Sequence, residues 1–213
     1  MQIDIYSDMV CPWCRIGKKN VLDAVAEWTA KSGEEVAIRY HAYLLDPTVP
    51  DEGLPFEASM SRKMGGADRI PEMLQRVTEA GAAVGVTFRF DRVTRMPNTV
   101  LAHRLTYLVP EDRREDWIDA VMTAYFEYGR DIAQREVLLE IAADLGFSSF
   151  EMESALAEGK GTEEVQQDLD HASAMGISGV PFFVLNNKYG LSGAYPASEF
   201  LRAFEKISAQ AQG

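Results

Sequence analysis

The first forty-five residues change twice between strand-like and helix-like spacing of their apolar positions. "QIDIYS" (2–7) alternates apolar and polar residues, which predicts a short strand. After Pro12 the apolar residues recur at helical spacing, and a proline is tolerated in a first helical turn because its missing N–H would be unpaired there anyway. "EEVAIRYHAYLL" (34–45) alternates again. These segments predict a strand–helix–strand unit with a right-handed parallel crossover.

The middle of the chain has a different pattern. Prolines and a glycine interrupt "LDPTVPDEGLPF" (45–56), and from there to about Gly176 the apolar spacing is helical. We predict helices around 70–77, 117–126 and 137–145, the last ended by Gly146. "SSFEMESALAEG" (148–159) and "GTEEVQQDLDHASAMG" (161–176) each begin with a Ser or Thr capping candidate, which predicts two more helices. Several antiparallel helices should result.

Strand signals return near the end of the chain. "VPFFVLN" (180–186) and "KYGLSG" (188–193), joined by a turn at "NNK", predict a hairpin, and "PASEFLRAFEKI" (196–207) predicts a closing helix. This order is explained best by an α/β fold whose sheet is split by an all-helical insertion. We predict one discontinuous domain of residues 1–48 and 177–213, with residues 49–176 as the insertion.

The composition and charge of the chain limit the classes of partner that it is expected to bind. The chain has 213 residues, 46% of them hydrophobic and 25% charged, and a formal net charge of −12 without any basic block. Its average field would repel a phosphate backbone, so we expect no nucleic-acid partner. No apolar run approaches the roughly 18 residues that cross a bilayer, and the start leaves no room for a secretory signal. We therefore expect a cytoplasmic protein without a membrane partner.

The chemistry is concentrated in "SDMVCPWCRIGKKNVL" (7–22), which contains the two cysteines of the chain. Two cysteines cannot form a disulfide framework, and three distant histidines do not complete the roughly four ligands of a metal site, so we predict no bound metal. Cys11 falls at a helix start, where unpaired N–H groups and the helix dipole stabilise a thiolate. Cys14, one turn later, is placed to resolve a mixed disulfide. These features predict a redox pair.

A second stretch, "GISGVPFFVL" (176–185), places Pro181 at the first position of a strand, where its missing N–H is tolerated. The bond between Val180 and Pro181 could be cis. Because only about 5–6% of X–Pro bonds are cis, the sequence pattern leaves this open.

Together, "CPWC", "SGVPFFV" and "SGAYP" resemble the DsbA-like thioredoxin-fold proteins, specifically the FrnE-like branch. "RMPNTVLAHRL" (95–105) and "YFEYGRDI" (125–132) within the insertion are similar to that branch as well. The resemblance implies a thioredoxin-like domain and dithiol–disulfide oxidoreductase or isomerase activity, with a cis Val180–Pro181 bond beside the cysteines. We predict Cys11 and Cys14 as catalytic residues, and Pro12, Trp13, Val180 and Pro181 as substrate-binding residues.

This interpretation requires no cofactor. The expected partners are protein or peptide thiols and disulfides, with glutathione or a thioredoxin system as candidate redox partners. One departure from the family pattern is that periplasmic DsbA proteins carry Pro-His between the cysteines, whereas this chain has Pro-Trp. Strongly oxidising behaviour is therefore not expected.

Two other functions stay open. The kappa-class transferases and 2-hydroxychromene-2-carboxylate isomerases resemble this chain in architecture, but they activate glutathione and usually have a serine near Cys11, so Cys14 argues against them. Asn98, Thr99 and Arg104 lie where those relatives have neighbours of the glutathione site. A simpler interpretation is that Asn98 starts a helix and Arg104 is a solvated charge. The second alternative is a chaperone-like module whose apolar, methionine-containing helical block binds unfolded chains.

Overall fold

The computed structural model describes residues 1–211. The last two residues of the predicted 177–213 segment lie outside this range, and no part of the structure tests the predicted domain boundaries. The strands are β1 (Gln2–Ser7), β2 (Ala37–Ala42), β3 (Leu54–Pro55), β4 (Arg95–Met96), β5 (Phe182–Leu185) and β6 (Tyr189–Ser192). The α-helices are α1 (Pro12–Ser32), α2 (Phe56–Met64), α3 (Ile70–Ala82), α4 (Val100–Leu108), α5 (Arg114–Phe126), α6 (Arg135–Asp144), α7 (Ser149–Ala157), α8 (Thr162–Ala174) and α9 (Ala197–Ala211).

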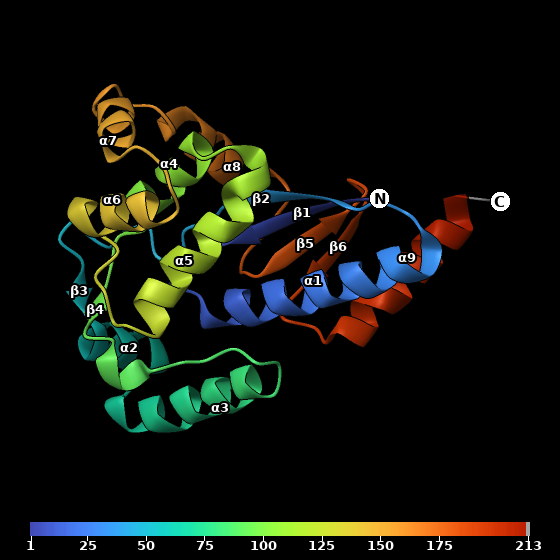
Figure 1. The fold of residues 1–213 in the computed structure, drawn as a ribbon. Helices are drawn as coiled ribbons and strands as arrows, with labels where there is room; N and C mark the ends of the chain where they lie inside the picture. The colour runs from blue at the N-terminus through green and yellow to red at the C-terminus, as the bar shows by residue number, and fades with distance from the viewer. Residues whose placement is uncertain (212–213) are drawn as a thin grey trace.

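Four strands form a mixed sheet in the order β2-β1-β5-β6. β1 pairs with β2 in parallel, while β1 with β5 and β5 with β6 are antiparallel. The predicted strand–helix–strand unit and the predicted hairpin are both confirmed. Figure 1 shows α1 and α9 side by side along one face of this sheet, and the two helices are in extensive contact.

Alternation along β1 divides its side chains between the two faces of the sheet. Ile3 and Ile5 are almost fully buried in the core that also contains residues of α1 and α9. Tyr6 belongs to a second, smaller cluster with Val184 and with Ala172 of α8. Both faces are therefore covered by helices, one by the first and last helices of the chain and the other by the insertion.

The turn between β5 and β6 is made by two asparagines. Asn186 and Asn187 have φ values of 49° and 54°, in the left-handed region that asparagine adopts more readily than most residues. Two consecutive positive φ angles match the twist of the flanking strands in a two-residue hairpin. The predicted turn at "NNK" is thus supported by its local backbone geometry.

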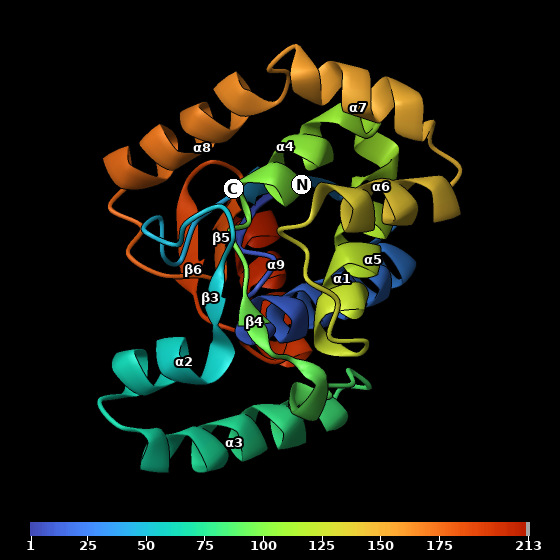
Figure 2. The ribbon, with the colours of Figure 1, turned by 90° about the vertical axis from the view of Figure 1, so that its left-hand side faces the viewer.

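The insertion holds the predicted helices, but it is not all helical. Leu54 pairs with Met96 and Pro55 with Arg95, forming a two-stranded ribbon of β3 and β4. The sequence pattern did not predict this ribbon, because the pairing partner of Leu54 lies far along the chain. Figures 1 and 2 show α2 and α3 on one side of the start of α1, and α4 to α8 on the other.

The capping predictions for the last two insertion helices had different outcomes. Ser148 caps α7, since its Oγ accepts the backbone N–H of Glu151 at 3.3 Å. Thr162, in contrast, is the first helical residue of α8 and does not cap it. Gly161 occupies the capping position with a left-handed φ of 79°, and a Cβ there would lie 2.5 Å from the carbonyl oxygen of Arg104. This close approach to α4 requires glycine.

Helix α5 joins the insertion to the thioredoxin-like part. Its apolar side chains predicted from the sequence are all buried in the main core: Trp117, Ile118, Val121, Met122, Tyr125 and Phe126. Two cations of α1 reach it. Arg15 bonds to Thr123 Oγ1 at 2.9 Å and pairs with Glu127 at 2.5 Å, and Lys18 pairs with Asp119 at 2.6 Å. The helix that begins at the cysteines is therefore anchored to the insertion along its first two turns.

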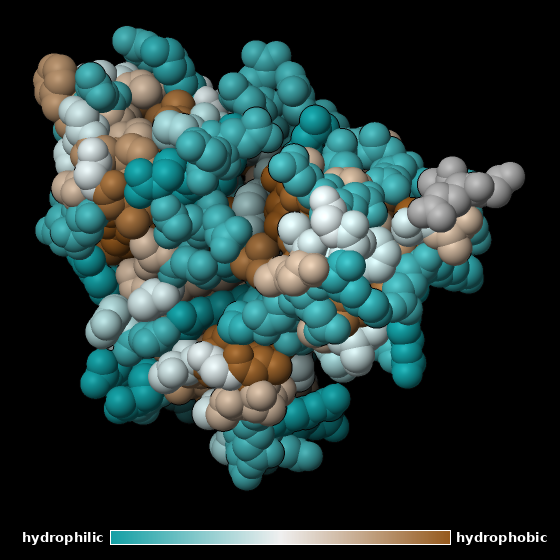
Figure 3. Space-filling view, turned by 45° about the vertical axis from the view of Figure 1, so that its right-hand side comes forward, coloured by the Kyte–Doolittle hydropathy of each residue, from teal (hydrophilic) through white to brown (hydrophobic). Residues whose placement is uncertain are grey.

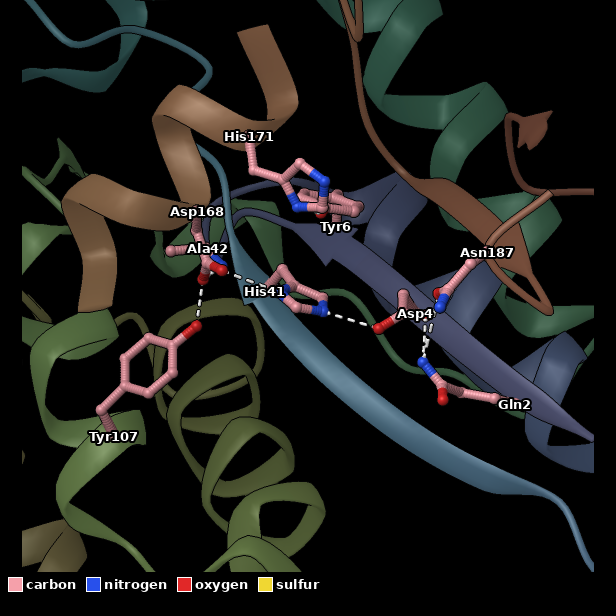
Figure 4. A network of polar contacts seen from close by, with 9 residues as sticks. All are labelled: Gln2, Asp4, Tyr6, His41, Ala42, Tyr107, Asp168, His171 and Asn187. Atoms are coloured by element: carbon pink, nitrogen blue, oxygen red, sulfur yellow. Dashed lines mark hydrogen bonds and ion pairs between the residues drawn. The ribbon is translucent and has the colours of Figure 1, made fainter. Parts of the chain in front are cut away.

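A polar network joins the insertion to the opposite face of the sheet (Figure 4). Asp168 of α8 accepts hydrogen bonds from the Ala42 backbone N–H at 2.6 Å and from Tyr107 of α4. His41 of β2 lies between Asp168, 2.7 Å from its Nδ1, and Asp4, 2.9 Å from its Nε2. His41 thus links β1, β2 and α8.

On the face shown in Figure 3, hydrophilic residues cover most of the surface and apolar residues form small, separate patches. The large hydrophobic side chains that are exposed are far apart in the sequence, and most lie outside the helices and strands: Leu45, Tyr128, Phe150, Met175 and Tyr195. Among residues 1–211, no helix has both the length and the apolar character needed to cross a membrane.

Candidate functional site

Cys11 is the N-cap residue of α1. Its backbone is extended (φ −91°, ψ 108°), Pro12 follows in the first turn, and its Sγ accepts the backbone N–H of Cys14 at 3.2 Å. This sulfur occupies the place that a Ser or Asp oxygen takes in an ordinary cap. A negative charge on Cys11 Sγ would be stabilised by that N–H and by the positive end of the helix dipole.

The Val180–Pro181 loop faces Cys11. The peptide bond between these two residues is cis, and the Val180 carbonyl oxygen lies 3.6 Å from Cys11 Sγ. The carbonyl can accept only from the protonated thiol, whereas the Cys14 N–H can donate to the thiol or the thiolate. The structure thus brings together Cys11, Cys14, Val180 and Pro181 from opposite ends of the chain.

Gly17 sets the distance between α1 and this loop. A Cβ at Gly17 would lie 2.9 Å from Pro181 Cγ and 3.2 Å from Phe183 Cζ. Both distances are too short for ordinary carbon contacts, so only glycine allows the helix to approach Pro181 this closely. Glycine has a low helix propensity, so Gly17 weakens α1 locally, but it lets the helix place the cysteines against the loop.

Cys14 is the more deeply placed of the two sulfurs. It is 1% exposed and Cys11 is 3% exposed, and both are free thiols. Burial raises the pKa of the Cys14 thiol well above its ordinary value, and the hydrogen bond with Cys11 and the charge of Cys11 act in the same direction. The Asp8 charge also raises this pKa, while a hydrogen bond with the Asp8 backbone lowers it. The Cys14 thiol therefore keeps its proton, and a proton acceptor is needed before Cys14 can attack as a thiolate.

Asp8, in the turn before the cysteines, is a site residue that our sequence reasoning missed. Its carboxylate is 2% exposed, and Oδ2 accepts the Leu45 backbone N–H at 2.8 Å. Its Oδ1 lies 3.5 Å from Nε2 of His103, which is 3% exposed and belongs to α4 of the insertion. Neither of these two atoms has a hydrogen-bond partner. A buried acid therefore lies in the turn before the cysteine pair, and a buried histidine of the insertion lies beside this acid.

The residues between the cysteines are partly accessible. Pro12 and Trp13 are both half-buried, and the Arg76 guanidinium of α3 lies 6.0 Å from the centre of the Trp13 ring. This geometry is that of a cation–π contact. It places one helix of the insertion beside the CPWC segment.

The residues predicted as neighbours of a glutathione site have mainly structural contacts. Asn98 starts α4 as expected, because its Oδ1 accepts the Val100 N–H at 2.9 Å, while Thr99 makes no side-chain cap. Arg104 is not the solvated charge that we expected. It is half-buried and donates to the Leu156 carbonyl at 2.8 Å and to the Lys160 carbonyl at 3.0 Å, because the end of α7 packs against α4.

The sequence matches the DSBA-like thioredoxin domain family over residues 2–205. The chain therefore belongs to this family, the DsbA-like thiol–disulfide oxidoreductases. A probable DsbA oxidoreductase from Streptomyces coelicolor is 31% identical in sequence and superposes with a TM-score of 0.88 over 98% of this chain and 90% of its own.

Two more distant structures share the fold. The cytosolic disulfide reductase DsbM from Pseudomonas aeruginosa, solved with GSH, is 21% identical with a TM-score of 0.67, covering 99% of this chain and 100% of its own. A 2-hydroxychromene-2-carboxylate isomerase is 16% identical with a TM-score of 0.69, covering 100% of this chain and 95% of its own. The expected thioredoxin-like fold with a helical insertion is confirmed.

Proposed function

We propose that this protein is a dithiol–disulfide oxidoreductase or isomerase in which Cys11 exchanges with the substrate and Cys14 resolves the mixed disulfide. The observation that carries the proposal is the geometry of Cys11. Its sulfur caps α1, accepts the Cys14 N–H at 3.2 Å and faces the Val180 carbonyl at 3.6 Å. A sulfur in this position is stabilised as a nucleophile and has a second thiol one helical turn away.

The reaction balances without any cofactor. The Cys11 thiolate attacks one sulfur of a substrate disulfide, the substrate S–S bond breaks, and the other substrate sulfur leaves as a thiolate that takes a proton. The Cys14 thiolate then attacks Cys11 Sγ in the mixed disulfide and releases the second substrate thiol. The substrate has gained two electrons, and the protein holds a Cys11–Cys14 disulfide. A thiol such as glutathione or a thioredoxin system returns it to the dithiol form, and the reverse sequence oxidises a dithiol substrate.

Asp8 supplies the proton acceptor for the second step. Cys14 is 1% exposed, so water has little access to its proton, and the Asp8 carboxylate charge acts on its sulfur. Asp8 Oδ1 is buried and has no hydrogen-bond partner among the described residues, so it is available to take the proton. We expect Asp8→Asn to slow resolution by about 100-fold at neutral pH, with the rate recovering as pH rises, since hydroxide replaces the lost base.

This expectation has a direct readout. Release of glutathione from a preformed mixed disulfide at Cys11 would be measured by rapid quenching across pH. Asp23→Asn, a change at an exposed carboxylate paired with Lys19, is the matched control. If Asp8→Asn resolves at the wild-type rate over the whole pH range, Asp8 is not the acceptor.

Protein or peptide thiols and disulfides are the substrates that this site supports. Half-buried Pro12, Trp13 and Val180 are placed around the sulfurs to contact a substrate chain, and the backbone beside Pro181 is placed to pair with it in a strand-like manner. The CPWC segment and the insertion stretches support a place in the FrnE-like branch. A cytoplasmic location is in keeping with DsbM, a cytosolic protein of the same fold.

Substitution of each cysteine tests the division of roles. Cys14→Ser should accumulate mixed disulfides between Cys11 and added peptide disulfides, visible by mass spectrometry, because the resolving thiol is missing. Cys11→Ser should abolish insulin reduction and the refolding of scrambled substrates. The doubly substituted protein, which can form neither species, is the control. Full activity of Cys11→Ser would show that the dithiol mechanism is wrong.

The glutathione-dependent alternative predicts a different result. A transferase or isomerase needs a saturable glutathione site, and occupancy at 100 times the dissociation constant stabilises a fold by about 2.7 kcal/mol. We expect no comparable thermal shift with glutathione or S-alkyl glutathione on the doubly substituted protein, in which covalent capture is impossible. A large saturable shift would favour the small-molecule enzyme.

A further inference from the structure

A cavity of about 320 Å³ lies in the insertion, where segments far apart in the sequence meet. It is lined by residues of the chain before β3, of α4 and of the start of α6, among them Asp51, Asn98, Leu101, Arg104 and Arg135. None of its lining residues belongs to the CPWC segment or to the Val180–Pro181 loop. Its volume suits a small molecule. The stretch "RMPNTVLAHRL", which the thiol chemistry does not use, contributes Asn98, Leu101 and Arg104 to this lining.

Arg104 brings a fixed positive charge to the cavity. Its Nε donates to the Lys160 carbonyl at 3.1 Å, and its Nη2 donates to the carbonyls of Leu156 and Lys160 at 2.8 and 3.0 Å. These carbonyls hold the guanidinium rigidly but carry no net charge. Within residues 1–211 no carboxylate forms an ion pair with Arg104, and its Nη1 is not used in these bonds. A rigid cation with a free donor is suited to bind an anion.

Arg135 adds a second positive charge that has little structural use. It is the first residue of α6, where the helix dipole disfavours a cation. Its ion pair with Glu153 is long, at 4.0 Å, and its side chain is 46% exposed. Burial lowers the pKa of Arg104, and repulsion from Arg135 contributes to the same effect. Both arginines line the same cavity, and an anion bound there would offset the repulsion between their charges.

Asp51 adds a carboxylate to the lining of the cavity. Asn98 donates from Nδ2 to the Val49 carbonyl at 2.8 Å and lies 3.5 Å from Asp51 Oδ1, so its amide is fully engaged by its own chain. The Asp51 carboxylate remains a hydrogen-bond acceptor for a ligand. The lining thus combines two cations with one anion, in a protein whose formal net charge is −12.

We propose that this cavity binds a small carboxylate or phosphate ester that also carries a hydroxyl or ammonium group. The anionic group binds between Arg104 and Arg135, and the donor group binds to Asp51. A single carboxylate or phosphate accepts from both guanidinium groups at once, which removes their repulsion. The site is separate from the cysteines, so its occupancy requires no thiol chemistry.

Isothermal titration calorimetry of the full chain tests the proposal with three probes: glutamate, succinate and inorganic phosphate. We expect saturable binding of at least one probe below about 10 mM, and a weakening of at least ~10-fold in Arg135→Gln. Glutamate should bind more tightly than succinate because its ammonium group reaches Asp51. Binding of phosphate alone would assign the site to phosphate esters, and binding of the two carboxylates alone would assign it to amino or hydroxy acids.

Two variants keep the result interpretable. Arg62→Gln makes the same charge change on an exposed residue of α2 that does not line the cavity, and it should bind every probe like the wild type. Arg104→Lys keeps the charge but loses the planar fork, and it should also weaken binding. The proposal is overturned if no probe binds saturably, or if Arg62→Gln weakens binding as much as Arg135→Gln. Because the measurement involves no turnover, neither outcome bears on the cysteine chemistry.

Discussion

His41 should make the stability of the protein fall as pH rises through the neutral range. Its imidazole lies between two carboxylates, 2.7 Å from Asp168 Oδ1 and 2.9 Å from Asp4 Oδ1. Burial opposes the charged imidazolium, but the hydrogen bonds and charges of Asp168 and Asp4 outweigh it and raise the pKa of His41 to about 9. The folded protein therefore holds this proton more strongly than the unfolded chain does.

The rise in the pKa of His41 from its ordinary value of 6.5 to about 9 corresponds to about 3 kcal/mol of folding free energy. This is an upper limit because the side chain is still 19% exposed and solvent screens part of the interaction. The contribution is fully present below pH 6.5, declines between pH 6.5 and about 9, and is absent above that range.

Urea unfolding of the wild type and of His41→Gln between about pH 6 and about pH 9.5 measures this effect. Glutamine retains a neutral hydrogen-bonding side chain, so the difference in the free energy of unfolding isolates the imidazolium charge. That difference should shrink by about 2 to 3 kcal/mol over the range. His171→Gln removes the 3.0 Å contact with the Tyr6 hydroxyl and an edge-on ring contact with Tyr6, but leaves His41 and both of its carboxylates in place, so it should keep the wild-type pH dependence. A difference that stays constant with pH would refute the reasoning.

Three further outcomes can be checked. Gly17→Ala should lower the melting temperature and slow thiol exchange, because the new methyl group would lie 2.9 Å from Pro181. The resulting strain of about 1–3 kcal/mol outweighs the roughly 1 kcal/mol that alanine gains in helix propensity. An equal or higher melting temperature with full exchange activity would contradict this. Iodoacetamide in limiting amount should label Cys11 before Cys14, because Cys14 is less exposed and burial raises its pKa. Equal labelling of the two cysteines, measured by mass mapping, would contradict the assignment of Cys11 as nucleophile and Cys14 as resolving thiol. Ser148→Ala should lose about 1 kcal/mol in urea unfolding through loss of the α7 cap, and an unchanged midpoint would show that this cap is not needed.

Most of the fold could be predicted because its signals are local. Periodicity located the strand–helix–strand unit, the hairpin and the helices α3, α5 and α6, since each element buries one face of its own segment, whereas α2 was not predicted. The β3–β4 ribbon could not be found this way. Its strands have two residues each, and what makes Leu54 a strand residue is Met96, far along the chain. A pairing this short leaves no periodic pattern in either segment.

The candidate site was predictable where a motif marks it. Cys11, Cys14 and the Val180–Pro181 loop each carry a local signal, and the structure brings them together. Asp8 and His103 carry none, because an acid after a strand and a histidine within a helix are unremarkable until the fold places them 3.5 Å apart. Asp8 precedes Cys11 by three residues, but this spacing alone does not indicate that its carboxylate is buried.

The contact between Asp168 and Ala42 has a consequence for self-association. β2 is an end strand of the sheet. The Tyr43 N–H donates inward to the Ser7 carbonyl at 3.0 Å. Because successive N–H groups of a strand point to opposite sides, the neighbouring Ala42 N–H points away from the sheet. Such outward N–H groups are templates on which a strand of another molecule can add. Here the Asp168 carboxylate occupies that position at 2.6 Å, so an incoming strand would have to displace a buried charge. The insertion thereby protects one edge of the sheet from aggregation, and β6 is the edge left for a further strand.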